Sequence, residues 1–290
     1  MIKNIAVFGA TGYLGAPVTK ALVDGGYNIS VLVRDIDIAS QIFPEGVEIV
    51  KGNLAYHHDI KKFLQGKDAV YCNLSVSPNE TETGFHLETD GLRKIINASQ
   101  ECGIKRIIYL SSLVQNYQKE NDFDWWVFEV KKEALNYVRD SGIPFTIFYP
   151  SNFMENFSHG YKKGIHLTLI GESRFPMFYI SVIDYAKMVV NSLKKLGNED
   201  REYDIQGPNC YTIQEAAELF KLHYTKAKLR IKTIGMGWAK FLALFDKKIA
   251  YDVRMAEALN NYNEIFVGDL AWEELGKPEI NLETFAKNAE

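Results

Sequence analysis

The sequence predicts an α/β protein in which a doubly wound parallel sheet carries a smaller, mainly helical C-terminal lobe. Apolar runs typical of strands alternate with amphipathic helical stretches through the first half of the chain. Continuous apolar strands indicate a parallel sheet that helices cover on both faces, with right-handed crossovers. Beyond Pro150 the alternation gives way to mostly helical segments. We expect these to lie over the carboxyl edge of the sheet, where open α/β sheets bind ligands.

The first strand, Ile5 to Phe8, runs directly into the sequence GATGYLG, and a helical stretch then extends to Val23. One glycine at a strand end allows a tight turn, a second lets backbone N–H groups approach a pyrophosphate, and a third lets the helix pack on the sheet. The helix N-terminus favours an anion. The junction therefore predicts a dinucleotide-binding Rossmann core, with ordinary tight turns as the alternative. The expected contacts are Gly9, Thr11, Gly12, Tyr13 and Leu14, with Gly15 as the packing glycine.

The later elements follow in the same alternation. Further strands are predicted at residues 29–33, 47–50, 69–74, 106–110 and 145–149, and helices at 58–64, 87–102 and 126–139. After Pro150 we expect helices at 151–162, 183–196, 213–222, 236–245, 251–265 and 282–289, and one short strand at 203–206. We assign residues 1–152 to the core, with 177–207 returning to it, and residues 208–290 with 153–176 to a smaller substrate lobe. Because no repeat, low-complexity tract or long linker interrupts the chain, the lobes should be continuous.

Composition excludes several classes of protein. The 290 residues include 33 basic and 37 acidic side chains with no basic stripe, so we expect no direct binding to nucleic acid. The three cysteines are far apart and the histidines lack ligand spacing, so we expect neither a disulfide framework nor a metal site. The N-terminal apolar run is broken by Gly9 and is too short for the pattern of a signal peptide, and no apolar run has membrane-spanning length, so we expect a cytoplasmic protein without a membrane partner.

The end of the second strand bears on the choice of nucleotide. In a dinucleotide fold an acid there hydrogen-bonds the ribose of NAD, whereas an arginine accommodates the extra phosphate of NADP. The strand ends in Arg34, and Asp35 follows. The planar guanidinium suits a phosphate, so we expect NADPH to be preferred over NADH. NAD stays a candidate because the carboxylate of Asp35 is placed to accept from its ribose. The alternative for both residues is structural: Arg34 is a solvated strand end, and Asp35 is a turn residue that begins the next helix. After the third strand, Asn53 is placed either to meet the adenine edge or to form an ordinary turn.

Several of these segments together resemble one family. They are GATGYLG, the strand-end arginine, Gly52 to Leu54, TIFYPSNFMENF at 146–157, VIDYAKMVV at 182–190 and QGPNCYTIQEAA at 206–217. In this order and spacing they resemble the NmrA-like branch of the atypical short-chain dehydrogenase/reductases. The resemblance implies a Rossmann core, NAD(P) as ligand and a cleft beneath the tail lobe. Family members include quinone and other small-molecule reductases, enzymes labelled sugar epimerases, and nucleotide-sensing proteins without known turnover, so fold alone does not decide function.

The wider superfamily's catalytic signature is Tyr-x-x-x-Lys, in which the lysine lowers the pKa of a proton-donating tyrosine and holds the nicotinamide ribose. The only match, Tyr224 to Lys228, lies in the tail lobe at a frequency expected by chance. The helix at the expected place matches the family's lysine at Lys131, with Lys132 one step away, but four residues earlier stand Val127 and Phe128. We therefore expect Lys131 to act alone, by binding ribose hydroxyls or by protonating a product. A solvated helix face is the alternative for both lysines.

Other candidates surround this place. The expected cofactor contacts also include Leu54, Leu74, Ser75, Tyr149, Pro150 and Asn152. Tyr149 stands where relatives often carry arginine, and either donates from the cleft or packs in the core, while Asn152 either reaches the carboxamide or caps the next helix. Ser111 and Ser112 either bond substrate or cap their strand. An aromatic cluster either lines a substrate pocket or forms core: Phe123, Trp125, Trp126 and Phe128.

Three functions follow as hypotheses. The first is an NADPH-dependent reductase that passes hydride to a small carbonyl, quinone or conjugated acceptor. The second is a regulatory protein that senses NAD(P) without turnover and presents its tail lobe to a partner. The third is a nucleotide-sugar epimerase, which ordinarily needs the missing tyrosine. Whether the protein forms a homodimer or meets a regulatory partner is left open by the sequence.

Overall fold

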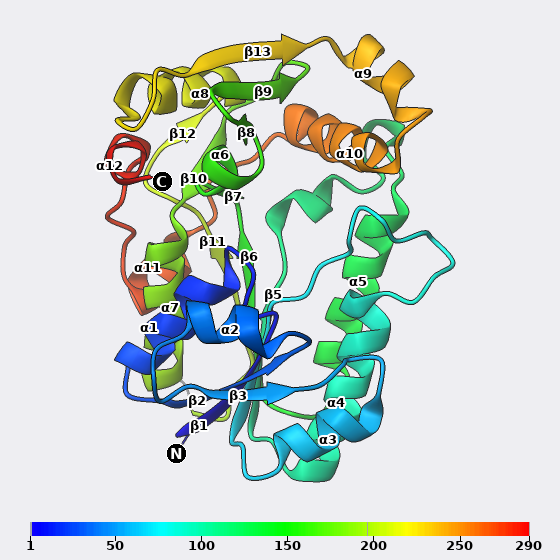
Figure 1. Ribbon diagram of the computed structural model, residues 1–290, viewed down its shortest axis with the longest axis vertical. Coiled ribbons are helices and arrows are strands. Elements are labelled where there is room, and N and C mark those ends of the chain that lie inside the picture. Colours follow the sequence, from blue (N-terminus) through cyan, green and yellow to red (C-terminus); the bar gives the residue numbers. More distant parts are fainter. Residues whose placement is uncertain (1, 196, 290) are drawn as a thin grey trace.

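A computed structural model describes residues 2–195 and 197–289 (Figure 1). Within these residues, seven parallel strands form the central sheet in the order β11-β6-β5-β4-β1-β2-β3. Their bounds are β1 (Asn4–Phe8), β2 (Asn28–Val33), β3 (Glu48–Lys51), β4 (Ala69–Cys72), β5 (Arg106–Leu110), β6 (Phe145–Pro150) and β11 (Arg201–Ile205). Strand order reverses between β1 and β4, which is the point where doubly wound sheets bind ligands. The predicted fold class is confirmed.

Helices cover both faces of this sheet, because residues that alternate along each strand are apolar on both sides. Ile5 and Val7 pack toward α1 (Gly15–Asp24) and α7 (Val182–Lys195), whereas Ala6 and Phe8 pack toward the other face. That other face carries α3 (His57–Leu64), α4 (Leu92–Cys102) and α5 (Trp126–Arg139), and the short α2 (Ile36–Ile42) links β2 to β3. A further helix, α11 (Asp269–Leu275), packs on α7, although its residues fall in the range expected for the smaller lobe.

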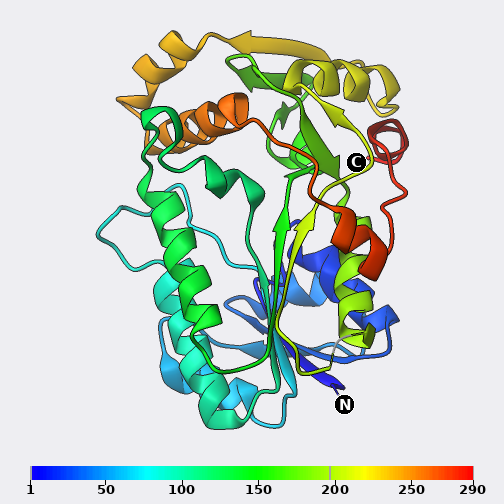
Figure 2. The same ribbon diagram turned by 180° about the vertical axis from the view of Figure 1, so that it is seen from behind.

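The smaller lobe lies over the carboxyl edge of the sheet, at the upper end of the molecule in Figures 1 and 2. It contains two three-stranded sheets among the described residues, with orders β12-β10-β7 and β13-β9-β8. Its strands are β7 (Asn152–Phe153), β8 (Lys162–Lys163), β9 (His166–Ile170), β10 (Met177–Ile180), β12 (Cys210–Tyr211) and β13 (Arg230–Ile234). Strand β10 lies in the range 177–207 that the sequence assigned to the core, but among the described residues it pairs with β7 and β12 and not with the central sheet. Its helices are α6 (Asn156–His159), α8 (Ile213–His223), α9 (Met236–Ala243), α10 (Lys247–Asn261) and α12 (Leu282–Asn288).

The lobe is where the predicted elements depart most from the structure. The helix expected over 151–162 is wrong: Asn152 and Phe153 pair with β10, and only one helical turn follows in α6. The helical preference of these residues is overridden by pairing with strand residues 27 positions later in the chain, which the local sequence pattern cannot reveal. The helix expected over 251–265 instead begins at Lys247, where Asp246 caps it. Leu196, the expected end of another helix, lies outside the described residues.

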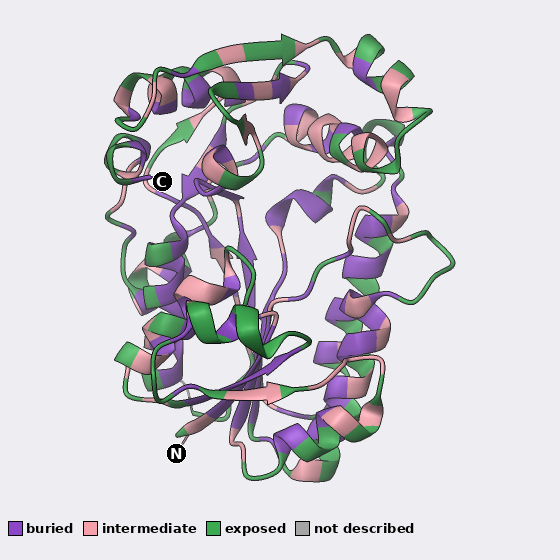
Figure 3. Ribbon diagram, viewed as in Figure 1, coloured by how far each residue is buried: buried purple, intermediate pink, exposed green. Residues whose placement is uncertain are grey.

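The core of each layer is buried, and the exposed surface is concentrated on the outer helix faces and on the top of the smaller lobe (Figure 3). None of the helices within residues 2–195 and 197–289 has the length and apolar composition needed to cross a membrane.

Candidate active site

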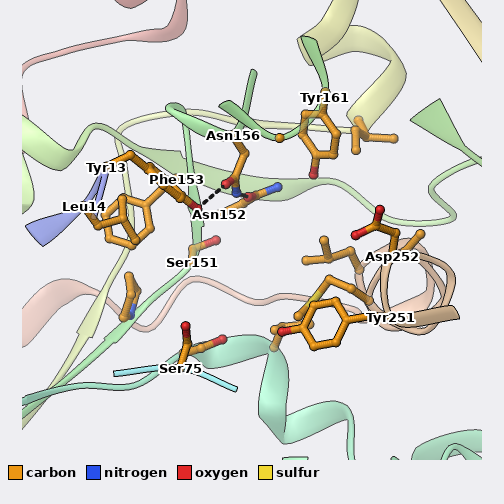
Figure 4. Close-up of a pocket in the computed structure, with 18 of the residues that line it drawn as sticks. Tyr13, Leu14, Ser75, Ser151, Asn152, Phe153, Asn156, Tyr161, Tyr251 and Asp252 are labelled. Atoms are coloured by element: carbon orange, nitrogen blue, oxygen red, sulfur yellow. Dashed lines mark hydrogen bonds between the residues drawn. The ribbon is translucent and has the colours of Figure 1, made fainter. Parts of the chain in front are cut away.

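A pocket of about 760 Å³ lies between the carboxyl edge of the sheet and the smaller lobe (Figure 4). One wall comes from the turn after β1 and from the ends of β4, β5 and β6. The opposite wall comes from β9, β13, α9 and α10, which contribute mainly apolar side chains. We call the wall from β9, β13, α9 and α10 the roof of the pocket. A more polar wall thus faces an apolar roof, an arrangement typical of a site that binds a polar cofactor beside a less polar substrate.

The three glycines of the first turn have different steric roles. Gly9 has a φ of 78°, and a Cβ there would lie 1.9 Å from the carbonyl oxygen of Asn73. A Cβ on Gly15 would lie 2.1 Å from the carbonyl oxygen of Gly9. These two glycines are required by the fold itself. A Cβ on Gly12 would meet nothing nearer than 3.6 Å in the described part of the chain, so this glycine leaves open space toward the pocket.

The start of α1 offers donors to an anion. No side chain of the described residues caps this helix, and its first turn carries no acidic residue. The N–H groups of Tyr13 and Leu14 donate to no acceptor within residues 2–195 and 197–289, and both residues line the pocket. Free N–H groups at the positive end of a helix dipole form a site for phosphate.

A chain of hydrogen bonds joins this turn to the smaller lobe. The hydroxyl of Tyr13 donates to Asn156 Oδ1 at 2.9 Å, and Asn156 Nδ2 donates to Asn152 Oδ1 at 2.6 Å (Figure 4). Asn152 Nδ2 lies 3.3 Å from the sulfur of Met177. Asn152 is therefore held by Asn156 of α6 and Met177 of β10 and caps no helix among the described residues, and its buried amide lines the pocket.

Lys131 lines the pocket from α5 and is ion-paired beneath it. Its Nζ donates to Glu88 Oε1 at 2.7 Å, and the same oxygen accepts from the hydroxyl of Tyr109 at 2.9 Å. The other oxygen of Glu88 accepts from the N–H of Val76 at 3.1 Å. Glu88 is fully buried on a π-helical turn, Leu87–Gly91, so its charge depends on these three donors. Lys132, one step along the helix, is exposed.

The places where the superfamily tyrosine would stand are both buried away from this pocket. Val127 and Phe128 pack in a cluster with Phe123, Trp125 and Tyr117. Of the two roles left open for the aromatic cluster, the structure shows packing: its four residues lie between α5 and α10, and none of them lines this pocket. Their neighbour Tyr251, from α10, packs edge-on against Trp125 and does line the pocket.

Comparisons with known proteins agree with this geometry. The model of the NmrA-like family matches residues 1–275. The chain belongs to the NmrA-like family. A (4-alkanoyl-5-oxo-2,5-dihydrofuran-3-yl)methyl phosphate reductase of Streptomyces griseus subsp. griseus is 27% identical over 81% of this chain and 79% of its own. The photosystem II assembly factor Ycf39 of Guillardia theta is 26% identical over 90% of this chain and 85% of its own. The crystal structure of the Citrobacter sp. triphenylmethane reductase complexed with NADP(H) shares the fold, with a TM-score of 0.77, 18% identity and coverage of 99% and 100%.

Most residues predicted from the sequence for this NmrA-like site lie together in the pocket. The lining includes Gly9, Thr11, Gly12, Tyr13, Leu14, Leu74, Ser75, Ser111, Ser112, Lys131, Pro150 and Asn152. Apart from Lys131, which lies in the middle of α5, they lie at or directly after the carboxyl ends of β1, β4, β5 and β6, which the strand order brings to one edge. Ser111 Oγ accepts from Gln115 Nε2 at 3.0 Å and still faces the pocket.

Four predicted residues lie outside the pocket lining. Tyr149 points to the outer face, where its hydroxyl donates to Glu202 and accepts from Arg139, so it packs rather than reaches the cleft. Asn53 Oδ1 accepts from the N–H of Ala55 in a turn, and Leu54 packs against α4 and its neighbours. Arg34 is exposed at the end of β2, and it makes no ion pair within the described residues. Asp35 caps α2 through the N–H groups of residues 37 and 38.

Sequence reasoning missed several polar groups of the site. Glu88, Tyr161, Tyr251, Asp252 and Glu264 lie in or directly beneath the pocket. Glu264 accepts from Ser151 Oγ at 2.7 Å and Gln206 Nε2 at 2.6 Å, and burial raises the pKa of its carboxyl. These residues follow no fixed spacing from the glycine turn, because packing of the smaller lobe decides which of its side chains face the core.

Proposed function

We propose that this NmrA-like protein is an NADPH-dependent reductase of a small quinone, carbonyl or conjugated acceptor. The observation that carries the proposal is one continuous pocket that runs from the free N–H groups of the glycine turn to an apolar roof. The Streptomyces relative is a reductase and the Citrobacter reductase binds NADP(H), and both support the proposal. We infer the acceptor from the mainly apolar side chains that β9, β13, α9 and α10 contribute to the pocket.

The residues of the core fit a dinucleotide. The space above Gly12 and the N–H groups of Tyr13 and Leu14 would receive the pyrophosphate. Lys131 and Asn152 lie farther along the same wall, where they would hold the nicotinamide end. When bound, the reduced nicotinamide supplies a hydride.

On this proposal Lys131 holds a ribose hydroxyl or donates the proton that follows hydride transfer. One of its three N–H donors is taken by Glu88, and the others are free to face the pocket. The ion pair fixes the position of Nζ, which is what a group that orients a ligand requires. The hydroxyl of Tyr251 makes no hydrogen bond within the described residues, so it would donate to the acceptor's oxygen. Burial and nearby carboxylates raise the pKa of this phenol, which keeps it protonated.

The proposal is tested by a screen of quinones, aldehydes and conjugated ketones with NADPH, followed through the loss of reduced nicotinamide absorbance. We expect turnover with at least one class of acceptor. If nucleotide binds tightly but no acceptor is reduced, the alternative is a nucleotide-sensing protein without turnover.

A preference for NADPH is expected to depend on Arg34. Loss of a charge-assisted contact to the 2′-phosphate should weaken NADPH binding by roughly tenfold in Arg34→Ala and leave NADH binding unchanged. Calorimetric titration of both nucleotides measures this, with Arg93→Ala as a matched control because Arg93 is also exposed and lies on α4. Equal affinity of the unmodified protein for both nucleotides would favour Asp35 as a ribose ligand instead.

Tyr251→Phe should raise the KM for the acceptor by roughly two- to tenfold, because one neutral hydrogen bond is lost, and should leave NADPH affinity unchanged. Steady-state kinetics with the acceptor varied measures the split between KM and kcat. Tyr137→Phe is the control, since Tyr137 donates to Glu133 on the outer side of α5. An unchanged KM in Tyr251→Phe would remove this residue from the acceptor site.

A further inference from the structure

Helix α9 exposes an unusual set of large apolar side chains to solvent. Trp238 is 60% exposed, Phe241 49%, Leu244 76% and Phe245 76%. Their spacing of three and four residues places them on one face of the helix and its C-terminal turn. Neighbouring rings are in contact: the ring centroids lie 5.3 Å apart in Trp238 and Phe241 and 5.5 Å apart in Phe241 and Phe245. We call these four residues the α9 ridge.

The opposite face of the same helix belongs to the pocket. Ala239 and Leu242 line its roof, and Ile234 and Ile249, from the segments before and after α9, line it as well. The helix is therefore apolar on both sides, and the exposure of the α9 ridge is not needed to close the pocket. A helix apolar all round is normally buried on both sides.

The segment that carries the α9 ridge is basic, although the chain as a whole has a net charge of −4. Residues 226–248 contain seven basic side chains and one acidic side chain, Asp246. Lys240 pairs with Glu257 at 2.9 Å. The other six form no ion pair within the described residues, and all are exposed: Lys226, Lys228, Arg230, Lys232, Lys247 and Lys248.

These charges and the α9 ridge lie at one end of the molecule. Strand β13, which carries Arg230 and Lys232, and helix α9 both lie at the upper end in Figures 1 and 2, and this end is largely exposed in Figure 3. The central sheet and the glycine turn lie below the smaller lobe, so this end can meet a surface without covering the nucleotide site.

We propose that this end of the molecule docks on a membrane surface that contains anionic phospholipid. Trp, Phe and Leu side chains would enter the boundary between headgroups and acyl chains, and the flanking lysines and arginine would face the negatively charged headgroups. This is peripheral binding by an interfacial segment, and it requires no spanning helix.

The charge pattern favours lipid over a second copy of the chain. A two-fold interface places the same surface on both partners, so the unpaired lysines around the α9 ridge would oppose the same lysines. An anionic bilayer instead neutralises them while it receives the apolar side chains.

Vesicle flotation tests the proposal without any measurement of activity. We expect the full-length protein to float with vesicles of mixed phosphatidylcholine and phosphatidylglycerol, to bind weakly to pure phosphatidylcholine, and to be released as salt is raised. Absence of binding to the mixed vesicles at low salt would overturn the proposal, whatever the outcome for reductase activity.

Two pairs of matched variants separate the apolar and basic contributions. Phe245→Ser should lower the fraction bound about tenfold or more, whereas Ile183→Ser, at a 52% exposed residue of α7, should not change it. Lys247→Gln with Lys248→Gln should weaken binding roughly tenfold or more, whereas Lys194→Gln with Lys195→Gln, an exposed lysine pair at the end of α7, should have little effect. Equal effects of both lysine pairs would show that vesicles attract any exposed lysine pair and not this surface in particular, and would contradict the proposal.

Sedimentation of the protein without vesicles tests the other candidate partner of the α9 ridge, a second copy of the chain. If the unmodified chain forms a dimer that Phe245→Ser dissociates, and the dimer does not bind the mixed vesicles, the α9 ridge is an interface between copies and the membrane proposal is wrong. Each variant should retain the thermal unfolding midpoint of the unmodified protein within the error of the measurement, because all the substituted side chains are exposed.

Discussion

Nucleotide binding should be lost in the Gly12→Val variant while the protein stays folded. The Cβ of residue 12 would meet no atom of the described chain nearer than 3.6 Å, so the substitution does not disturb packing. Its side chain would instead fill the space that the pyrophosphate needs above the start of α1. We expect affinity for NADPH to fall by about a hundredfold or more, since the phosphates lose their backbone donors. Calorimetric titration measures the affinity, and thermal unfolding measures the fold.

The neighbouring glycines explain why Gly12 is the informative position. Valine at Gly9 or Gly15 would place Cβ within 1.9 and 2.1 Å of backbone oxygen, and those variants should fail to fold. Gly235→Val is a matched control, since a Cβ there meets nothing within 4 Å of it in the described chain and the residue lies in the smaller lobe. Unchanged nucleotide affinity in Gly12→Val would contradict the proposed location of the pyrophosphate.

Turnover should fall about a hundredfold or more in Lys131→Met if this lysine donates the proton. Methionine keeps the approximate length of the side chain and removes its charge and donors. Nucleotide binding should weaken less, because the pyrophosphate contacts remain. Lys132→Met is the register control, since one step along a helix turns a side chain by about 100° and Lys132 is exposed. Equal losses in both variants would place neither lysine at the site.

Because Lys131 pairs with Glu88, the Lys131→Met variant loses stability as well as a pocket donor, and a double variant separates the two effects. Removing Lys131 leaves a buried carboxylate with only Tyr109 and the N–H of Val76, at a cost of about 3 to 5 kcal/mol. The double variant Lys131→Met with Glu88→Gln removes the unpaired charge, so stability should recover while turnover stays low. If turnover recovers together with stability, Lys131 serves the fold and not the reaction.

The core could be predicted from the sequence because its signals are local. Each buried parallel strand is a continuous apolar run, and the glycine turn lies between a strand and a helix within the first 15 residues. Once the strands are ordered, the positions at their carboxyl ends meet at one edge, and this brings Leu74, Ser111 and Pro150 to the pocket.

The smaller lobe could not be predicted in the same way, because its contacts join distant segments. The short strand β7 exists through pairing with β10, and β13 pairs with β9 more than 60 residues away. The role of Glu88 was missed for the same reason. It lies at the start of a predicted helix, but its partner in the interior is Lys131, 43 residues later in the chain. Tyr149 follows the packing alternative: it is buried, and its hydroxyl donates to Glu202 on the neighbouring strand β11.

Transfer of a deuterium label from the nicotinamide ring shows whether the protein is a reductase. The protein would be supplied with NADPH deuterated on one face of the nicotinamide ring and with an aldehyde or conjugated ketone identified in the screen, and the product would be examined by mass spectrometry. The account predicts label on the carbon of the reduced acceptor from one face only, and no transfer in Gly12→Val. Tight NADPH binding without label in any product would contradict a reductase, and would favour a nucleotide-sensing role for this fold.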